Sequence, residues 1–324
     1  MTPLRSRSAI LWSASAVCIL TLGLAWFLIA PHTPALRAAE TRAAPPSTSS
    51  RPADPRSLNI ISANVRFADP DDGINLWNNR RALLVATLQD HNPDIIGCQE
   101  VTPAQATYLL KELKGFSFAK DNHADLLSAP AGLMGVMNML FYRADRFTLL
   151  ATADGPLRPE APQSVATENA YYTLAVLADR NHLFPDLIVI DTHLRHGVAN
   201  AAASAQKIHT LIAAQRKTYP KAQAIVLGDM NHGRGTPVYD ALLGPKDGGD
   251  PLIDTFDYTT KPAAERWGTY HAFAGKPLAD LPSDLIFISP ALNSTPATIL
   301  RDHTPPPDNR YPTDHFLVLT TLTP

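Results

Sequence analysis

Acids, amides and histidines flank short apolar runs at six places along this chain. The residues that could do chemistry there are Asn64, Glu100, His193, Asp229, Asn231, Asp284, Asp314 and His315. Carboxylate and amide oxygens suit a hard divalent cation, and imidazoles and carboxylates can position water and move protons. Any single one of these residues is also explained by a turn. Six such places in succession, each beside an apolar run, predict one shared site at the ends of strands.

The elements that must position these residues alternate between strand and helix patterns. In residues 75–90, Leu76, Leu83, Leu84 and Leu88 repeat with helical spacing and are expected to share a buried face. Short apolar strands mixed with helices predict an α/β fold in which helices cover the sheets. Further helices are expected at residues 103–113 and 198–219, and strands at 58–65, 93–98, 135–142, 171–178, 187–191, 224–227, 285–288 and 316–322.

The composition bounds the function classes. The chain has 324 residues, of which 45% are apolar and 18% charged, so it can bury a large core. Residues 58–324 carry 22 basic and 28 acidic residues, a net charge of −6. This charge argues against strong, sequence-independent binding of a polyanion such as DNA. It does not exclude a nuclease, because a metal site itself gathers carboxylates. Two cysteines, Cys18 and Cys98, form no CxxC pair, which excludes a thiolate zinc site of the usual spacing.

The N-terminus is organised differently from the rest. Residues 9–30 are uncharged over 22 positions and follow Arg5 and Arg7, so residues 1–30 are either an uncleaved signal-anchor or a long signal peptide. The length favours the anchor. Both place the following chain outside the cytoplasm, in the periplasm or at the cell surface, or secreted if the segment is cleaved. Residues 31–57 are rich in Pro, Ala and Ser and predict a tether, and 58–324 is the expected folded domain.

Six motifs resemble, in order, those of the endonuclease/exonuclease/phosphatase superfamily, the family of pancreatic deoxyribonuclease, in its bacterial metal-dependent hydrolase branch. They are SANVR, IIGCQEV, IDTHLRHG, VLGDMNHG, PSDLIFIS and YPTDHFLV. The resemblance covers residue 58 to the C-terminus. It implies a four-layered α/β/β/α sandwich of two mixed β-sheets flanked by helices. It also implies a divalent cation, Mg²⁺ or in its place Mn²⁺, and hydrolysis of a phosphate ester by water.

The resemblance also implies roles for single residues. Glu100 matches the family's metal carboxylate, Asn64 the amide that supports the metal or phosphate, and Asp314 a carboxylate near the metal. Thr313 stands where the family usually has serine. Tyr142 and Arg143 follow a strand and match either a phosphate contact of the family or a simple hairpin.

The remaining matches are catalytic. Asp229 matches the acid that orients or deprotonates the attacking water, and Asn231 the amide that holds the phosphate. Their spacing points both side chains the same way if the segment is extended. His193 matches a phosphate-contacting histidine, and His315 the essential histidine beside the scissile phosphate. Asp284 matches the acid paired with it, which fixes the imidazole's tautomer.

These matches predict a Mg²⁺-dependent phosphoric ester hydrolase held at a membrane. Its substrate class stays open between nucleic acid, a phospholipid and a small phosphate ester. The acidic body lowers the expectation of duplex DNA, and the N-terminal segment favours a lipid. The alternative is a catalytically inactive binding or scaffold domain at the membrane, whose signature would be a lost acid or histidine, and none is missing. Endo or exo mode, monoester or diester preference and oligomeric state stay open.

Overall fold

The computed structural model describes residues 56–119, 136–157, 170–244, 250–259 and 267–324. All of them belong to the second of two compact units, Ala44–Pro324. The expected signal-anchor and most of the expected tether lie outside the described residues. Among the residues described, no helix is both long and apolar enough to cross a bilayer.

Two β-sheets form the centre of the unit. In the first sheet the strands follow the order β11-β13-β1-β2-β4-β3, and β12 also pairs with β13. The pair β1–β2 is parallel whereas β1–β13 is antiparallel, so the sheet is mixed. Its strands are β1 Leu58–Asn64, β2 Ile95–Val101, β3 Phe116–Phe118, β4 Met137–Arg143, β11 Asn293–Ser294, β12 Thr298–Leu300 and β13 Leu317–Thr323.

The second sheet is also mixed. Its order is β5-β6-β7-β8-β10-β9, with β7–β8 parallel and β8–β10 antiparallel. Its strands are β5 Phe147–Pro156, β6 Tyr171–Asp179, β7 Leu187–His193, β8 Gln223–Asp229, β9 Ile253–Asp254 and β10 Asp284–Ile288.

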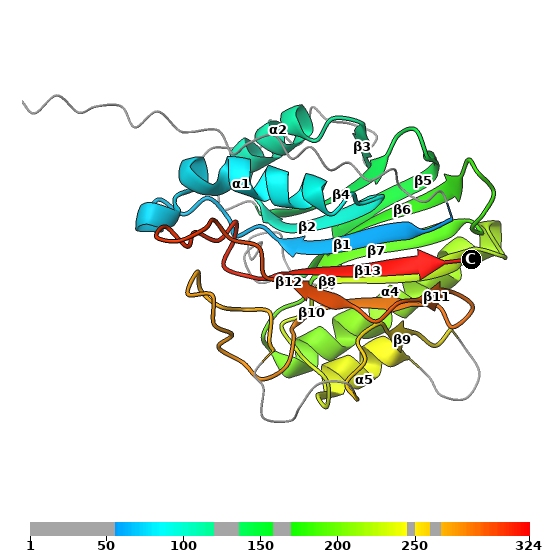
Figure 1. Ribbon diagram of the computed structural model, residues 1–324. Coiled ribbons are helices and arrows are strands. Elements are labelled where there is room, and N and C mark those ends of the chain that lie inside the picture. The colour runs from blue at the N-terminus through cyan, green and yellow to red at the C-terminus, as the bar shows by residue number, and fades with distance from the viewer. Residues whose placement is uncertain (1–55, 120–135, 158–169, 245–249, 260–266) are drawn as a thin grey trace, which may run out of the picture. The chain divides into compact units, whose positions relative to one another are not determined.

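Helices cover the outer faces of both sheets (Figure 1). Residues of both sheets pack face to face in the larger apolar core, which also takes in α4 and α5, whereas α1 and α2 share a second core with β1, β2 and β4. The expected pair of mixed sheets flanked by helices is therefore confirmed. The helices are α1 Trp77–Asp90, α2 Pro103–Glu112, α4 Val198–Thr218 and α5 Pro237–Leu243, and a short 3₁₀ turn, η1, spans Gly73–Asn75.

The buried face of α1 differs from the expected leucine face. Leu84 and Leu88 are buried as expected, but Leu76 precedes the helix and is 37% exposed. Trp77 and Arg80 lie on the buried face instead. The expectation for Leu76 was wrong because α1 begins at Trp77, and Leu76, with φ −45° and ψ 141°, lies before the helical repeat starts.

Candidate active site

Regular strand pairing arranges three polar residues in the second sheet. Asp229, the last residue of β8, pairs with His193 of β7 on one side and Asp284 of β10 on the other. Asp229 and Asp284 are buried and His193 is partly exposed. Gly228, just before Asp229, has φ +146°, and a Cβ there would overlap the carbonyl oxygen of Thr192. Only glycine allows β7 and β8 to pair this closely beside Asp229.

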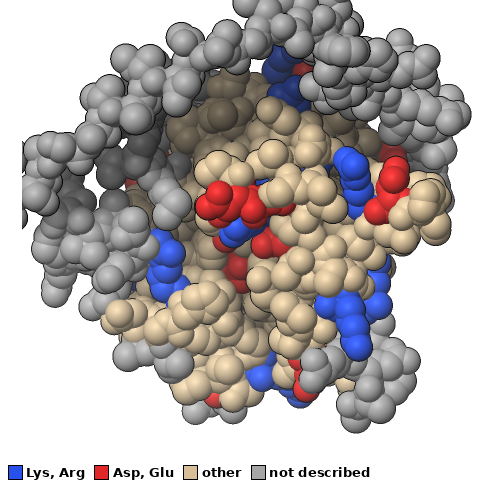
Figure 2. Space-filling view, turned by 90° about the vertical axis from the view of Figure 1, so that its left-hand side faces the viewer, with Lys and Arg blue, Asp and Glu red and all other residues tan. Residues whose placement is uncertain are grey.

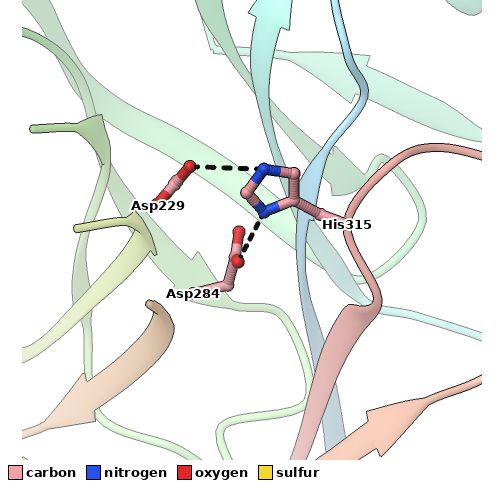
Figure 3. Close-up of side chains that lie close together, drawn as sticks. All are labelled: Asp229, Asp284 and His315. Atoms are coloured by element: carbon pink, nitrogen blue, oxygen red, sulfur yellow. Dashed lines mark hydrogen bonds and ion pairs between the residues drawn. The ribbon is translucent and has the colours of Figure 1, made fainter. Parts of the chain in front are cut away.

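An imidazole lies between two buried carboxylates (Figure 3). His315 Nδ1 donates to Asp284 Oδ2 at 2.8 Å, and His315 Nε2 lies 3.8 Å from Asp229 Oδ2. Burial alone would lower the pKa of His315, but the charges of Asp284 and Asp229 outweigh it and raise that pKa to about 10. Burial, with the nearby charge of Asp229, raises the pKa of Asp284. The ring is therefore cationic at neutral pH and oriented by Asp284.

Asp229 is connected differently. Burial would raise the pKa of Asp229, but the charges of His315 and His193 and the bonds from Asn231 and Asn64 hold that pKa below its usual value. Its Oδ1 accepts the backbone N–H of Asn231 at 2.9 Å. Asn231 has φ +54°, so the segment 229–231 is not extended, and the condition under which both side chains would point the same way is not met. The chain turns sharply because Asp229 caps its own turn.

The turn gives Asn231 a clear task. Its Nδ2 lies within hydrogen-bond distance of His193 Nε2, at 2.8 Å, and donates to the carbonyl oxygen of Leu194 at 2.7 Å. His193 Nε2 lies 3.6 Å from Asp229 Oδ2. The amide of Asn231 therefore orients the imidazole toward the acid.

Asn64 joins the two sheets. It ends β1 and is 1% exposed, and its Nδ2 donates to Asp229 Oδ2 at 3.0 Å and to Glu100 Oε1 at 3.2 Å. A single amide thus bridges the acid of the first sheet and the acid of the second. Glu100, Asp229 and His315 consequently lie in one site, although 36 to 165 positions separate Asn64 from its two partners.

Glu100 occupies an irregular point of β2. Its φ is +62°, and the pairing of β2 with β4 shifts register between Cys98 and Val101. The backbone N–H of Phe67 donates to Glu100 Oε2 at 3.1 Å. A left-handed glutamate inside a strand stores backbone strain of about 1–3 kcal/mol, and such strain concentrates at functional sites.

Asp314 is the least connected of the eight predicted residues. Within the described ranges its carboxylate forms no hydrogen bond with the other seven, and Oδ2 lies 3.9 Å from Arg66 Nε. The neighbouring Thr313 hydroxyl donates to the carbonyl oxygen of Asn64 at 2.7 Å and so holds this segment against β1. Burial raises the pKa of Asp314; His315 opposes that rise and the charge of Glu100 adds to it.

The face at the carboxyl end of β1 is viewed in Figure 2. Acidic side chains gather at its centre, some of them set back in a hollow, with basic atoms among them, and further Lys and Arg lie in separate small groups around them. Among the described residues drawn in this view, Lys and Arg form no continuous stripe.

Comparison with family models decides the family. The model described as the Endonuclease/Exonuclease/phosphatase family matches residues 61–315. The chain belongs to this family. No curated protein matches it.

Several solved structures share the fold of this chain. A Bacteroides thetaiotaomicron mannosyl-6-phosphatase is 21% identical and covers 82% of this chain and 99% of its own, with a TM-score of 0.68. A Bacteroides vulgatus endonuclease/exonuclease/phosphatase is 24% identical over 82% and 98%, with a TM-score of 0.66. D. rerio TDP2, solved with a single strand DNA product, is 20% identical over 83% and 99%, with a TM-score of 0.59.

The resemblance to the family implies a divalent cation, and the donor set fits one. Glu100 and Asp314 offer carboxylate oxygens, which Mg²⁺ and Mn²⁺ prefer. Asn64 turns its Nδ2 toward Glu100, and its Oδ1 accepts the backbone N–H of Arg66 at 3.0 Å, so in this arrangement its amide supports Glu100. Glu100 accepts hydrogen bonds from the neutral donors Asn64 and Phe67, and its charge raises the pKa of Asp314. A cation between the two acids would relieve that repulsion.

A second group of potential ligands fits a cation less well. One ligand atom each from Asp229, Asp284 and His315 lie within 4.8 Å of one another. The charges of Asp284 and Asp229 raise the pKa of His315 to about 10, so Nε2 as well as Nδ1 carries a proton at neutral pH, whereas a metal-ligating histidine must be neutral. We therefore interpret this group as the acid–imidazole pair Asp284–His315 beside Asp229.

Tyr142 and Arg143 lie at the opposite end of the first sheet. Tyr142 pairs with Ile95, the first residue of β2, and Arg143 Nη2 bonds to Asp145 Oδ2 at 3.0 Å in the turn toward β5. The hairpin interpretation of these two residues is the one that fits.

Two arginines near the site escaped sequence reasoning. Arg66 follows Asn64 within the SANVR motif, and its Nη2 is bonded to Asp69 and Asp72. Arg80 lies on the buried face of α1. A cation at a core-facing helical position is the signal that would have found Arg80, because such a residue must have partners inside the protein.

Proposed function

We propose that this chain is a divalent-metal-dependent hydrolase of phosphate esters that uses water as the nucleophile. The observation that carries the proposal is the environment of one buried carboxylate oxygen, Asp229 Oδ2. It lies 3.0 Å from Asn64 Nδ2, 3.6 Å from His193 Nε2 and 3.8 Å from His315 Nε2. An ionised acid that lies between Asn64, beside the proposed metal ligands, and the imidazoles of His193 and His315 is placed to orient a water toward a phosphate.

A divalent cation held by Asn64, Glu100 and Asp314 would polarise a phosphoryl oxygen and offset its developing charge. The ionised Asp229 accepts a hydrogen bond from the attacking water and aligns it.

The cationic imidazole of His315 has its Nδ1 proton committed to Asp284. Its Nε2 is therefore the group that donates to the charged oxygens of the transition state or to the leaving oxygen. His193, oriented by Asn231, supplies a second imidazole contact to the phosphate.

The substrate class within phosphate esters is the finer part of the proposal. Phosphodiesters in nucleic acid or a phospholipid head group, and small phosphate esters, all suit this chemistry. The similar structures include one described as a mannosyl-6-phosphatase and one solved with a DNA product. The net charge of −6 over residues 58–324 favours substrates other than duplex DNA.

A substrate panel tests the activity. The full chain is assayed with plasmid DNA, RNA, sphingomyelin, a sugar phosphate and a chromogenic phosphodiester, each with Mg²⁺, with Mn²⁺ and with excess EDTA. We expect turnover of at least one substrate with metal and its loss with EDTA. Turnover that persists in excess EDTA would refute the proposed requirement for a divalent metal. Asp229→Asn serves as the inactive control.

The rival is a binding or scaffold domain without catalysis. The intact set of eight residues favours the enzyme, since a scaffold has no need of a strained glutamate or a buried cationic imidazole. Binding of a phosphate ester with no turnover of any substrate, at any tested metal concentration, would favour the rival.

We also propose that residues 1–30 anchor the chain in a membrane with the hydrolase domain outside the cytoplasm. The support is the uncharged stretch of residues 9–30 after Arg5 and Arg7. Cell fractionation and protease accessibility test this proposal. The full chain should sediment with membranes and be cleaved by external protease, and a chain lacking residues 1–30 should do neither.

A further inference from the structure

Arg80 makes an unusual set of contacts. It is 2% exposed, and its guanidinium donates five hydrogen bonds, all to backbone carbonyl oxygens. The acceptors are Val65 at 2.6 Å, Arg66 at 2.7 Å, Asn75 at 2.9 Å, Pro312 at 3.2 Å and Phe67 at 3.4 Å. No carboxylate of the described residues lies within 4.0 Å of it. A buried arginine whose N–H groups all donate to backbone carbonyl oxygens holds those backbone segments in place.

Four of the five bonded carbonyls belong to the two segments that carry proposed metal ligands, and the fifth, that of Asn75, lies in η1. Residues 65–67 directly follow Asn64, and the N–H of Phe67 donates to Glu100. Pro312 lies two positions before Asp314. One planar group thus ties the segment after β1 to the segment before β13, which are 232 positions apart at the bond to Pro312.

The charge of Arg80 complements the site without touching it. Burial lowers the pKa of Arg80 to about 10, against the raising influence of Asp314, Asp72 and Glu100. The guanidinium therefore stays cationic at neutral pH beside the acids. Its hydrogen-bonding capacity is taken up by carbonyls, so a substrate contact is excluded as its role.

We propose that Arg80 is a positioning residue that holds residues 65–67 and Pro312 at a fixed spacing and thereby sets the affinity of Asn64, Glu100 and Asp314 for a divalent cation. This inference rests on the proposed metal site. It requires the fork geometry of arginine as well as its charge, because an ammonium group cannot span carbonyls from three segments.

Matched variants of α1 test the proposal in the full chain. Arg80→Lys keeps the charge and removes the fork, and Arg80→Met removes both. Arg81→Met is the control of equal chemistry, because Arg81 lies 4.8 Å over the ring of Tyr108 and away from the two segments. Leu88→Ala removes a fully buried side chain of the same helix and controls for lost stability.

The readouts are Mg²⁺ binding by isothermal titration calorimetry and amide hydrogen exchange at residues 65–67 and 312–315. Both Arg80 variants should bind Mg²⁺ about 10- to 100-fold more weakly, the usual effect of losing a group that orients metal ligands. Exchange should accelerate in both segments. Arg81→Met and Leu88→Ala, compared per folded molecule, should match the wild type within about twofold.

Two outcomes overturn the proposal. One is an Arg80→Lys protein with wild-type Mg²⁺ affinity, and the other is a Leu88→Ala protein that loses as much affinity. If the wild type binds no divalent ion and hydrolyses nothing, the proposed function fails, and hydrogen exchange alone then decides whether Arg80 clamps the two segments. Unchanged exchange in the Arg80 variants would overturn the clamp as well.

Discussion

The two halves of the site are built in different ways. Asp229, Asp284 and His193 lie side by side because three strands of the second sheet pair in regular register. Glu100 instead sits at a left-handed residue where β2 loses register with β4, and Asp314 is held through its neighbours. One half follows from β-pairing alone, whereas the other depends on contacts from separate segments. Proton chemistry and metal binding should therefore fail separately.

The largest expected effect comes from removing His315, the imidazole that bonds to Asp284 of the regular half. His315→Ala removes the cationic imidazole and should lower kcat/KM by roughly 10²–10⁴-fold. Mg²⁺ affinity should stay within about threefold of the wild type, because the three proposed metal ligands are untouched. Steady-state kinetics and calorimetry on the same preparation check both parts. Wild-type-like hydrolysis by His315→Ala would refute its assignment, and circular dichroism establishes that the fold is intact.

Breaking the irregular half should show the opposite pattern. Glu100→Ala removes one carboxylate and should weaken Mg²⁺ binding about 10- to 100-fold. Activity should then recover in part as Mg²⁺ is raised, which His315→Ala cannot match. A titration of rate against Mg²⁺ concentration measures the shift. An Mg²⁺ dependence equal to that of the wild type would remove Glu100 from the metal site.

A smaller effect tests the strain at Glu100. Glu100→Gly and Glu100→Ala both lose the carboxylate, so their difference in free energy of unfolding isolates the cost of a positive φ. Glycine should be more stable than alanine by about 1 kcal/mol, the reverse of the usual order in strands. Ala63→Gly, at a buried position of β1, is the control and should destabilise by about 0.5–1 kcal/mol or more. Urea denaturation measures all three variants, and equal stability of the two Glu100 variants would mean no strain.

The smallest effect concerns a buried acid beneath the site. Gln99 Nε2 donates to Asp191 Oδ1 at 2.6 Å between the sheets, and among the described residues Asp191 Oδ2 and Gln99 Oε1 have no partner. Burial raises the pKa of Asp191 well above its usual value, partly opposed by the bond from Gln99. The folded state thus holds this proton more tightly than the unfolded chain, so the stability it contributes is present at low pH and lost as pH rises above about 4.

Asp191→Asn should consequently raise the Tm at pH 8 by a few degrees. Each kcal/mol gained in the free energy of unfolding raises the Tm by about 2–4 °C. The gain should shrink as the pH falls to 4. Thermal melts from pH 4 to pH 9 measure it, with the exposed Asp71→Asn as control. A Tm difference that grows toward low pH would contradict the sign.

The sequence predicted the members of the site better than its geometry. Each of the eight polar residues stands next to an apolar strand, and strand order was enough to expect that they meet. The sequence left a turn and an extended segment open at residues 229–231, because the letters GDMN do not show whether Asp229 accepts the backbone N–H of Asn231. The left-handed Glu100 was missed because a bulge arises only when β2 pairs with β4.

The fold was predictable where the pattern was simple. Apolar runs such as 187–191 and 224–227 were found, whereas β5 was missed because its exposure alternates and it lies at the edge of its sheet. Arg80 was missed because hydrophobic periodicity scores only apolar positions. The five carbonyls that it binds come from three separate segments, which no local pattern reveals.

Gly228 has a consequence for how homologous chains should be judged. Because its missing side chain lets β7 and β8 meet beside Asp229, a homologue that substitutes this glycine would keep its full complement of reactive groups and still lose their alignment. A search for active homologues should therefore check that the position of Gly228 holds glycine, in addition to checking the acids and histidines.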